Sequence, residues 1–457
     1  MKLGFIAMSG VRALNEELTE LGLTLPGFVE RGKVIASLPS LGLLTLAALT
    51  PKEIEVQYCE VEKFNDLDEV PEQFDAVAIS SFTAQIKEAY CLADKYREKG
   101  TKVIMGGLHV NAMPEEASIH ADAIVLGEGE LAWPTLTRDL QNNCLQSVYD
   151  MRGENFDLSN APIPRFDLLD INKYNRLTVQ TQRGCPHNCE FCASSILLTP
   201  HFKVKPVEKV IEEIQYIKKL WPKPFIEFAD DNTFANKTHA KKLLRALTKE
   251  DIRWFTETDI SIAEDDELLM LLRESGCAQV LIGLESPSKK SLDGLELHSN
   301  WKARQIEKNL DAIKKIQSYG ITVNGCFILG LDGTDVNSFQ EVLDFVQEST
   351  MYEVQITIQT PFPGTPLYDR LKSNARLLDE RAWETCTLFD VNFKPDSMSV
   401  KELQNHFKWL INELYNEERT MLRRQKFRSN LRKLKHSNIN RLSNKVVEPI
   451  KNPRAAF

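Results

Sequence analysis

Hydrophobic and polar positions in the first third of the chain switch repeatedly between a strand-like and a helix-like period. Short apolar runs of the strand type occur at Leu3–Met8, Ile54–Cys59, Ala76–Ser80, Val103–Met105 and Ala123–Leu126. Segments with helical periodicity lie between them, at Leu41–Leu49, Ala84–Lys99, Pro114–His120 and Glu130–Gln141. Short apolar strands that alternate with amphipathic helices favour a parallel sheet covered on both faces. We therefore predict a doubly wound, Rossmann-like (flavodoxin-like) α/β domain over residues 1–145.

A second α/β region follows a segment of different composition. Residues 146–176 are rich in Asn, Pro and mixed charges, which predicts a linker. Strand patterns then resume at Leu177–Thr181, Phe225–Ala229, Trp254–Thr258, Gln279–Leu284, Thr322–Leu329 and Glu353–Thr360. The helical patterns include Pro206–Lys219, Lys237–Leu247, Asp266–Glu274, Trp301–Ser318 and Asp335–Glu348. Six strand–helix units predict a partial (β/α)6 TIM barrel over residues 177–370, with its chemistry at the C-terminal strand ends.

Residues 371–457 are predicted to form a helical extension with a basic tail. Apolar and polar positions alternate with a helical period over residues 380–418, including Val400–Asn416, and we expect this part to cap the barrel mouth. Eight basic residues then follow without an acidic one: Arg419, Arg423, Arg424, Lys426, Arg428, Arg432, Lys433 and Lys435. A solvated helix or disordered end is one interpretation, and peripheral docking to an anionic lipid or an acidic partner is the other.

Composition narrows the class of protein. With 56 basic and 65 acidic residues the net charge is −9, which argues against a protein that coats nucleic acid. Nine cysteines, an odd number with only three of them clustered, do not indicate a disulfide framework. We expect a cytoplasmic, reducing location. The apolar run Leu41–Leu49 is about half a membrane span, so no transmembrane helix is predicted.

Three cysteines share one loop in the spacing C-x3-C-x2-C: Cys185, Cys189 and Cys192. Thiolates at this spacing can bind three irons of a [4Fe–4S] cluster and leave the fourth iron without a protein ligand. An open metal position is typical of a catalytic site. A zinc ion completed by His187 or His201 is the alternative, although the repeated C-x2-C pair of zinc knuckles is absent. With Phe191 before the third cysteine, the loop resembles the signature of the radical S-adenosylmethionine (SAM) superfamily.

This resemblance implies where the barrel would hold SAM. The superfamily's acidic motif, which receives the SAM amino group, corresponds to Asp230 and Asp231 after the second strand. Capping of the following helix is the alternative role for this position. Glu285 and Ser286 follow the fourth strand, where family members contact the ribose and methionine parts of SAM. An N-cap before Pro287 explains these two residues nearly as well.

Three further features of the barrel fit the same superfamily. Glu257 and Asp259, at the end of the third strand, are weaker candidates for contacts with SAM or substrate. Gly325 lies in a segment that resembles the late glycine motif next to adenine, and we expect the neighbouring Cys326 to be a packed thiol. The sequence from Pro361 to Tyr368 matches the P-x-P-G-T-P-L-Y turn that closes these cores.

Polar and glycine-rich segments also follow the strands of the first domain. They comprise Ser80, Ser81, Phe82 and Thr83, then Gly106, Gly107 and His109, then Gly127, Glu128 and Gly129. Ligands of doubly wound sheets bind beyond these strand ends. Together the segments resemble the cobalamin-binding domain found ahead of some radical SAM cores. The D-x-H-x-x-G motif, which supplies a histidine to cobalt, is absent, so His109 is expected on a loop near the corrin rather than as an axial ligand.

The resemblance covers residues 1 to about 370 and implies three cofactors: a [4Fe–4S] cluster, SAM and cobalamin. It implies reductive cleavage of SAM to a 5′-deoxyadenosyl radical, hydrogen abstraction from an unactivated carbon, and methyl transfer from methylcobalamin. An external electron donor such as flavodoxin or ferredoxin is implied as well. A loose likeness to hopanoid methylases favours a small-molecule or lipid-like substrate.

Three alternatives stay open at this point. Some members of the family use cobalamin for cyclisation or rearrangement without methylation. Methylthiotransferases share the two-domain layout but need three more cysteines, and Cys59, Cys91 and Cys144 are scattered. A cobalamin or redox sensor without enzymatic activity would leave the SAM-like motifs at several strand ends unexplained.

Overall fold

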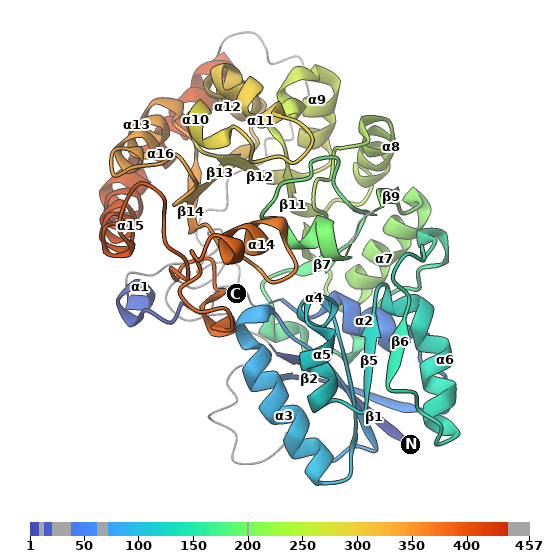
Figure 1. The fold of residues 1–457 in the computed structure, drawn as a ribbon. Helices are drawn as coiled ribbons and strands as arrows, with labels where there is room; N and C mark the ends of the chain where they lie inside the picture. Colours follow the sequence, from blue (N-terminus) through green and yellow to red (C-terminus); the bar gives the residue numbers. More distant parts are fainter. Residues whose placement is uncertain (9–12, 21–37, 62–71, 199–200, 437–457) are drawn as a thin grey trace.

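The structure is a computed structural model of the chain and describes residues 1–8, 13–20, 38–61, 72–198 and 201–436. Its β-structure consists of two six-stranded parallel sheets and one two-stranded antiparallel ribbon. Figure 1 shows the first sheet below, with blue to teal strands, and the second sheet above it, with green to orange strands. This arrangement confirms the predicted α/β architecture.

The first sheet has the strand order of a flavodoxin-like fold. Its strands are β1 (Lys2–Met8), β2 (Glu55–Val61), β3 (Ala76–Ser80), β4 (Lys102–Gly106), β5 (Ala123–Leu126) and β6 (Val148–Asp150). All pairs are parallel, in the order β2-β1-β3-β4-β5-β6. The order reverses between β1 and β3, and doubly wound sheets open a ligand crevice at such a point.

Helices cover both faces of this sheet, as the hydrophobic pattern predicts. They are α2 (Leu41–Leu49), α3 (Ile86–Glu98), α4 (Leu108–Ala112), α5 (Pro114–His120) and α6 (Gly129–Gln141), whereas α1 (Glu16–Glu20) buries Leu18 in the core of the second sheet. Helices α2 and α6 share a buried core with Phe5, centred on Trp133. Helices α3, α4 and α5 bury their apolar side chains against Ile79 on the opposite face. The apolar run Leu41–Leu49 is thus a buried helix, and Ser40 caps its N-terminus by accepting from the Leu43 N–H at 3.4 Å.

Two predictions for this region need correction. Strand β6 lies within the predicted linker and pairs with β5, so the sheet extends beyond residue 145. A three-residue edge strand is too short to show an alternating pattern, and only its Tyr149 is buried. His109 lies in helix α4 and not on a loop, and its side chain is 1% exposed. This five-residue helix is too short to produce a helical period in the sequence.

The second sheet is an open half-barrel. Its strands are β7 (Leu177–Val179), β10 (Phe225–Phe228), β11 (Arg253–Thr258), β12 (Cys277–Glu285), β13 (Thr322–Leu329) and β14 (Glu353–Ile358), all parallel and paired in that order. The antiparallel ribbon joins β8 (Gln182–Arg183) to β9 (Lys203–Val204). Each of the six strands was predicted within a few residues, and the partial (β/α)6 barrel is confirmed.

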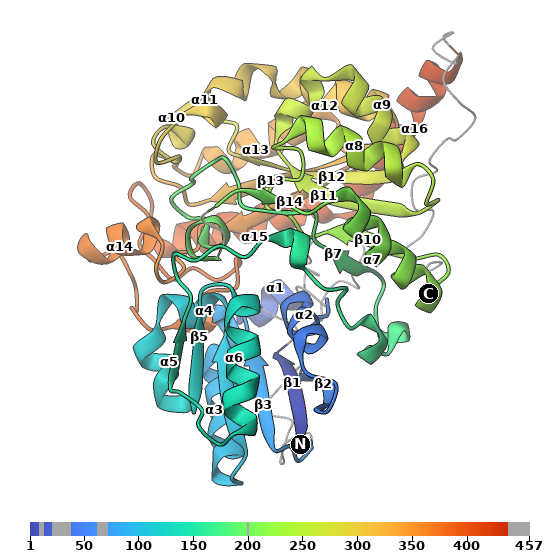
Figure 2. The ribbon, with the colours of Figure 1, turned by 90° about the vertical axis from the view of Figure 1, so that its right-hand side faces the viewer.

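Helices cover the outer face of the half-barrel in Figure 2. They are α7 (Val207–Leu220), α8 (Lys237–Leu247), α9 (Asp266–Glu274), α10 (Lys289–Leu292), α11 (Trp301–Gln305), α12 (Asn309–Ser318) and α13 (Ser338–Ser349). The predicted single helix Trp301–Ser318 is divided by a 3₁₀ turn at Ile306–Lys308. The division lets Lys302 of α11 reach into the barrel, while Ile313 of α12 packs against the sheet.

The C-terminal part is helical only in places. Its helices are α14 (Pro366–Ser373), α15 (Val400–Tyr415) and α16 (Glu417–His436). The prediction of helical structure from residue 380 is wrong for the stretch before α15, where only a 3₁₀ turn at Trp383–Thr385 forms. Ser399 and Glu402 form a capping box that starts α15.

Part of the basic tail is held against the rest of the protein by specific contacts. Arg424 forms an ion pair with Glu353 of β14, and the buried Arg423 donates to the Leu414 carbonyl at 2.8 Å. Only the backbone is described at Lys433 and Lys435, and residues 437–457 lie outside the described part of the chain. Among the described helices, none combines the length and the apolar character that crossing a bilayer requires.

Candidate functional site

The three clustered cysteines occupy the loop between β8 and a π-helical turn at Ser194–Leu198. Cys189 is buried, and Cys185 and Cys192 are partly exposed. Burial raises the pKa of the Cys185 thiol to about 11 and that of Cys189 to about 12. Thiolates are the form that binds iron, so metal binding must displace these protons. Three thiols on one short loop are a donor set that fits three irons of a [4Fe–4S] cluster.

The two aspartates after β10 hold this loop in place. Asp230 is 4% exposed and accepts the N–H groups of Thr181 at 2.7 Å and Gln182 at 3.1 Å. Because hydroxyl groups of Thr181 and Thr233 also donate to Asp230, its oxygens are fully engaged inside the protein. Burial raises the pKa of Asp230 to about 6, although these hydrogen bonds oppose the shift. Asp230 therefore anchors the loop, a role that differs from the predicted contact with SAM.

Asp231 is closer to the cysteines. One of its oxygens accepts the Gly184 N–H at 3.2 Å, and the other accepts the Ser194 hydroxyl at 2.5 Å. Gly184 precedes Cys185, and Ser194 follows Cys192 by two positions. Asp231 thus brackets the cysteine loop and places a carboxylate beside it.

His187 is one of the two residues proposed as the fourth ligand of a zinc site. Both of its ring nitrogens lie next to carboxylates. Its Nε2 lies 3.3 Å from Asp259, and its Nδ1 lies 3.2 Å from Glu296. Burial opposes ionisation of Asp259, but hydrogen bonds led by the one from His187 outweigh it and hold the pKa of Asp259 well below its usual range. No three His, Cys, Asp or Glu side chains in the described ranges surround a single metal position. In a [4Fe–4S] cluster each thiolate binds a different iron, so the three cysteines need not surround one position.

The loop is also tied to the turn that closes the barrel. Glu190 receives two hydrogen bonds from Arg370 of α14, at 3.0 and 2.6 Å, and its carbonyl accepts the Leu367 N–H at 3.1 Å. Thr365 caps α14 by accepting the Tyr368 N–H at 3.2 Å. The P-F-P-G-T-P-L-Y segment therefore supports the cysteine loop directly.

Glu285 and Lys302 form a buried ion pair at the end of β12. Lys302 Nζ lies 2.5 Å from Glu285 Oε1 and donates to the Gly283 carbonyl at 3.0 Å. Glu285 has a φ of +61° at an irregularity in the β12–β13 register, and such strain is concentrated at functional sites. A Cβ on Gly283 would lie 2.5 Å from Glu285 Oε1, so a larger residue there would displace this carboxylate. The sequence did not single out Lys302, because nothing local marks it among the many surface lysines.

Glu257 projects from β11 into the same space. Glu257 is exposed over more than a third of its surface, and the nearby carboxylates include that of Glu285. Enclosure by protein, followed by repulsion from Glu227 and Asp231, raises the pKa of Glu257 above the usual carboxyl range. The barrel mouth therefore carries excess negative charge, which suits a cationic ligand such as SAM.

The remaining barrel residues from the sequence lie around this centre. The Ser286 side chain is buried and accepts the Ser288 N–H at 3.1 Å. Phe191 packs between the main barrel core and a smaller cluster around Leu292. Gly325 faces away from the barrel interior, since a Cβ there would lie 2.7 Å from Met351 Sδ. Packing behind the sheet therefore explains this glycine.

The strand ends of the first sheet present small and weakly polar groups. Ser81 Oγ and Thr83 Oγ1 are buried without a hydrogen-bond partner, while Phe82 between them is 53% exposed. Gly107 lies next to Ser80, because a Cβ on Gly107 would lie 3.4 Å from Ser80 Oγ. Unpaired hydroxyls beside an exposed aromatic ring fit a flat ligand with polar edges, as a corrin has.

Gly127 and Gly129 allow tight packing after β5. Gly127 has a φ of +78°, and a Cβ there would lie 2.6 Å from the Met151 carbonyl carbon. Asn111 of α4 accepts the Gly127 N–H at 2.7 Å. Gly129 leaves room for Leu46 of α2. Gly106 ends β4 beside Val125, so the predicted glycines do gather at one edge of the sheet.

Glu128 turns toward the other half of the molecule. It pairs with Arg183 at 2.6 Å and with Lys203 at 2.5 Å, and its neighbour Glu130 also pairs with Arg183. All four side chains are at most 14% exposed. Since Arg183 stands two residues before Cys185, this network connects the first sheet to the cysteine loop. His109, by contrast, lies under Trp383 of the C-terminal part, with ring centroids 5.2 Å apart.

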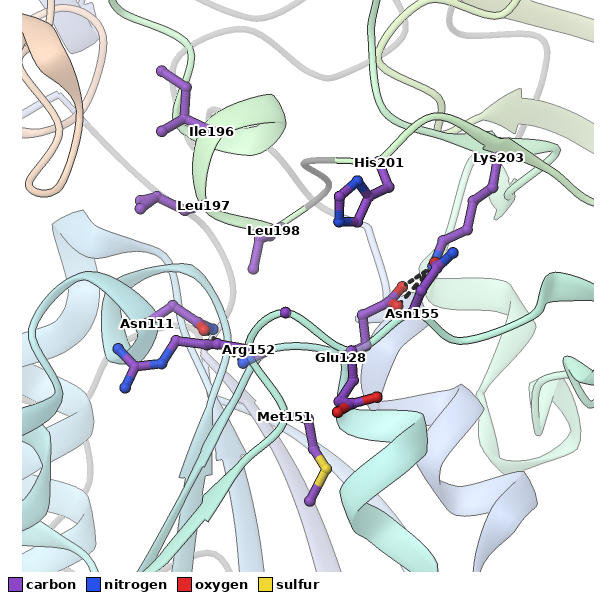
Figure 3. Close-up of a pocket in the computed structure, with 13 residues that line it drawn as sticks. Asn111, Glu128, Met151, Arg152, Asn155, Ile196, Leu197, Leu198, His201 and Lys203 are labelled. Carbon is purple, nitrogen blue, oxygen red and sulfur yellow. Dashed lines mark hydrogen bonds and ion pairs between the residues drawn. The ribbon is translucent and has the colours of Figure 1, made fainter.

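A cavity of about 290 Å³ lies between the two halves (Figure 3). One side is formed by the segments that follow β5 and β6, including Gly127 and Arg152, and the other by Ile196, Leu197 and Leu198 of the π-helical turn. Lys203 crosses to Glu128 at its edge, as the dashed lines in Figure 3 show. The cavity thus joins the strand ends of the first sheet to the loop that carries the cysteines.

Comparisons with known proteins agree with this two-part arrangement. Residues 179–346 match the radical SAM superfamily, residues 31–137 match the B12 binding domain, and residues 365–451 match a domain of unknown function, DUF4070. The bacteriochlorophyllide d C-8(2)-methyltransferase of Chlorobaculum tepidum is 30% identical over 373 residues, covering 78% of this chain and 80% of that protein. The hopanoid C-2 methylase of Rhodopseudomonas palustris is 28% identical, covering 76% and 67% respectively.

A solved structure shows the same fold. The radical SAM methyltransferase TsrM from Kitasatospora setae, with cobalamin and a [4Fe–4S] cluster bound, superposes with a TM-score of 0.62 at 14% identity. The match covers 91% of this chain and 89% of that one. Together with the relatives above, it supports an enzyme that uses a [4Fe–4S] cluster, SAM and cobalamin. The chain belongs to the family of radical SAM methyltransferases that carry a B12-binding domain.

Proposed function

We propose that the enzyme methylates an unactivated carbon of a small organic substrate held between the two halves of the molecule. The observation that carries this proposal is the network that connects Glu128, at the end of β5, to Arg183, beside the cysteine loop, at 2.6 Å. Because of this network, the strand ends expected to hold the corrin lie next to the loop expected to hold the cluster. A substrate between them would be close to both.

The residues divide into three roles. Cys185, Cys189 and Cys192 would hold the cluster, which together with SAM and cobalamin supplies the radical and methyl-transfer chemistry. Asp231, Glu257 and the Glu285–Lys302 pair would bind and orient SAM, whose positive charge suits the negative barrel mouth. Ser80 to Thr83, Gly106, Gly107 and Gly127 would let the backbone approach the corrin closely and exclude water from its face.

The substrate that we propose is a largely apolar ring compound. Two similar proteins are named for action on bacteriochlorophyllide d and on hopanoids. Met151 and the three residues Ile196, Leu197 and Leu198 give the cavity between the two halves an apolar wall. We further propose an external one-electron donor and a cytoplasmic location, because the chemistry needs a reducing environment.

The structure disfavours a methylthiotransferase. Cys59 lies on β2, Cys91 is exposed on α3, and Cys144 is exposed beyond α6 on the opposite face of the sheet. Because Cys144 lies on the face opposite Cys59 and Cys91, these three thiols do not converge on a second cluster. Cyclisation without methylation remains the alternative that needs an experiment, since a related protein is named as a cyclase.

The decisive experiment is anaerobic purification followed by isotope transfer. We expect about four irons and about one corrin per chain. Incubation with SAM carrying a deuterated methyl group, a strong reductant and bacteriochlorophyllide d as the first substrate should give 5′-deoxyadenosine and a product heavier by a deuterated methyl unit. Formation of 5′-deoxyadenosine with a ring-closed, unlabelled product would overturn methylation in favour of cyclisation. Iron without any corrin would contradict the proposal as a whole.

A further inference from the structure

One segment of the C-terminal part leaves the barrel and packs on the first sheet's domain. In Figure 1 it is the orange chain that follows α14 and reaches the start of α3. Residues 380–390 form this stretch, which we name the clasp, and the 3₁₀ turn at Trp383–Thr385 lies at its centre. The clasp falls within the region that matches a domain of unknown function.

Trp383 is the principal contact of the clasp. Its side chain is 3% exposed, and its indole N–H donates to Glu116 of α5, with distances of 3.0 and 3.3 Å to the two oxygens. The indole ring meets the His109 ring edge to face at 5.2 Å. Trp383, Cys386 and Tyr368 belong to the same buried cluster as the core on the α3 side of the first sheet. A hydrophobic core of one domain is thus completed by side chains from another part of the chain.

Polar contacts on both sides of Trp383 extend the attachment. Lys87 at the start of α3 pairs with Glu384 at 2.6 Å. Asp390 accepts the N–H groups of Leu14 at 2.8 Å and Asn15 at 3.1 Å. These two residues precede α1 (Glu16–Glu20), whose Leu18 packs in the core of the barrel half. The clasp therefore contacts the first domain at α5 and at the start of α3, which follows β3 in the chain.

The clasp and the Glu128 network act on different edges of the first domain. Glu128 and Glu130 follow β5 and pair with Arg183, whereas the clasp contacts α3 and α5. A single attachment would leave the domain free to rotate about it. Together with contacts such as that of Tyr174 with Glu60 of β2, the two separated attachments restrict both the distance and the angle between the two halves.

We propose that the clasp fixes the orientation of the cobalamin-binding domain over the barrel, with Trp383 as its central positioning residue. The proposal rests on the family assignment and does not depend on the substrate. The role of the C-terminal region is therefore to maintain the distance between the two cofactor sites.

The test compares two tryptophans of the C-terminal part in the enzyme reconstituted with its cluster and hydroxocobalamin. Trp383→Ala removes the buried contact, while Trp409→Ala removes a side chain on α15 that is 37% exposed. We expect hydrogen exchange of the α5 amides to become roughly tenfold faster in the Trp383 variant, because local opening exposes these amides. Its radius of gyration in solution scattering should also increase. The Trp409 variant should match the wild type in both measurements.

Two readouts separate positioning from general stability. In the Trp383→Ala variant, exchange in the six barrel strands and the iron content should stay at wild-type values. Unchanged α5 exchange and radius of gyration would overturn the proposal, and so would a uniform increase in exchange over both sheets.

If Trp383→Ala does not fold, variants of Glu116, which accepts the indole hydrogen bond, test the same contact. Glu116→Gln retains an oxygen that accepts the indole N–H, whereas Glu116→Leu does not. We expect α5 exchange near the wild-type rate in the first variant and faster exchange in the second. Equal exchange in both variants would refute the role of this contact. Because none of these measurements uses methylation, their failure would leave the proposed function intact.

Discussion

The two parallel sheets present very different chemistry at equivalent strand ends. The barrel strands end in charged groups, among them Asp231, Glu257 and Glu285, with Lys302 inserted beside them. In the first sheet, β3 and β4 end in the small neutral residues Ser80 and Gly106, and Gly127 follows β5. Charges in a partly enclosed site attract a cationic ligand, while small residues let a backbone approach a broad flat one. The comparison therefore indicates that one sheet binds its cofactor through charge and the other through shape.

The first sheet does have charged groups, but it uses them differently. Glu128 and Glu130 follow β5 and both point to Arg183 across the interface. In the barrel, by contrast, the carboxylate of Glu257 stays in the open mouth. The carboxylates of Glu128 and Glu130 thus hold the two halves of the molecule together, whereas the carboxylate of Glu257 is available to a ligand.

The largest expected effect comes from removing the cluster ligands, which tests whether the cluster site and the corrin site are independent. Replacing Cys185, Cys189 and Cys192 together with alanine should reduce iron from about four per chain to background and abolish 5′-deoxyadenosine formation. Cobalamin content should persist, because the strand ends of the first sheet do not use these thiols. Iron and corrin analysis of the anaerobically purified variant gives the answer. Simultaneous loss of corrin would show that the two sites are not separable.

Breaking the buried ion pair tests the importance of charge in the barrel. Lys302→Met leaves the Glu285 carboxylate, 7% exposed, without its partner. We expect the barrel to lose roughly 3–5 kcal/mol of unfolding free energy and to bind SAM more weakly. Denaturant unfolding and equilibrium dialysis with SAM measure the two effects.

A nearby lysine provides the control for this variant. Lys308 pairs with Glu264, but the two side chains are 65% and 56% exposed. Lys308→Met should therefore change stability by less than about 1 kcal/mol. Equal losses in the two variants would mean that the Glu285–Lys302 pair has no special role.

Two glycines test the importance of shape in the first sheet. Gly127→Ala adds a Cβ 2.6 Å from the Met151 carbonyl carbon at a φ of +78°, while Gly153→Ala adds one in open space at a φ of +87°. We expect the first to cost about 1–3 kcal/mol and to weaken cobalamin binding, and the second to cost about 1 kcal/mol or less. Absorbance titration with hydroxocobalamin distinguishes them. Equal corrin affinity in both variants would contradict a binding role for Gly127.

The smallest expected effect concerns pH and Glu257. Between the ordinary carboxyl pKa and the raised pKa of Glu257, the folded protein keeps a proton that the unfolded chain releases. The unfolding free energy should therefore fall as pH rises through this interval. Glu257→Gln should flatten that part of the curve, whereas Glu98→Gln, on the exposed end of α3, should not. Urea unfolding at several pH values measures the slopes, and parallel curves for Glu257→Gln and the wild type would contradict the effect.

Local periodicity carried most of the fold prediction. Ala76–Ser80, Leu41–Leu49 and Lys237–Leu247 form the elements that their patterns predict, because a buried face repeats within each element. The short elements β6 and α4 were missed, since three to five residues hold less than two full periods. The non-helical clasp was predicted as helix because its apolar residues, Trp383 among them, bury against a distant domain.

The role of a side chain was predictable only where it depends on the spacing of residues close together in the sequence. Asp230 and Asp231 look equivalent in the sequence. In the structure, however, Asp230 is buried and accepts a hydrogen bond from Thr181, whereas Asp231 accepts one from Gly184 in the cysteine loop. Lys302 was missed because its partner Glu285 is 17 positions away. No local pattern connects such residues.

The sequence by itself determined the spacing of Cys185, Cys189 and Cys192, the alternation of strands and helices, and the order of the two sheets along the chain. Spacing and periodicity are properties of neighbouring residues, so they survive without any knowledge of the fold. Only the tertiary structure decided that His109 lies beneath Trp383 and that Glu128 meets Arg183, residues 55 positions apart in the chain. Such pairings arise when packed layers bring distant side chains into contact, and their burial then determines which charges remain available for a ligand.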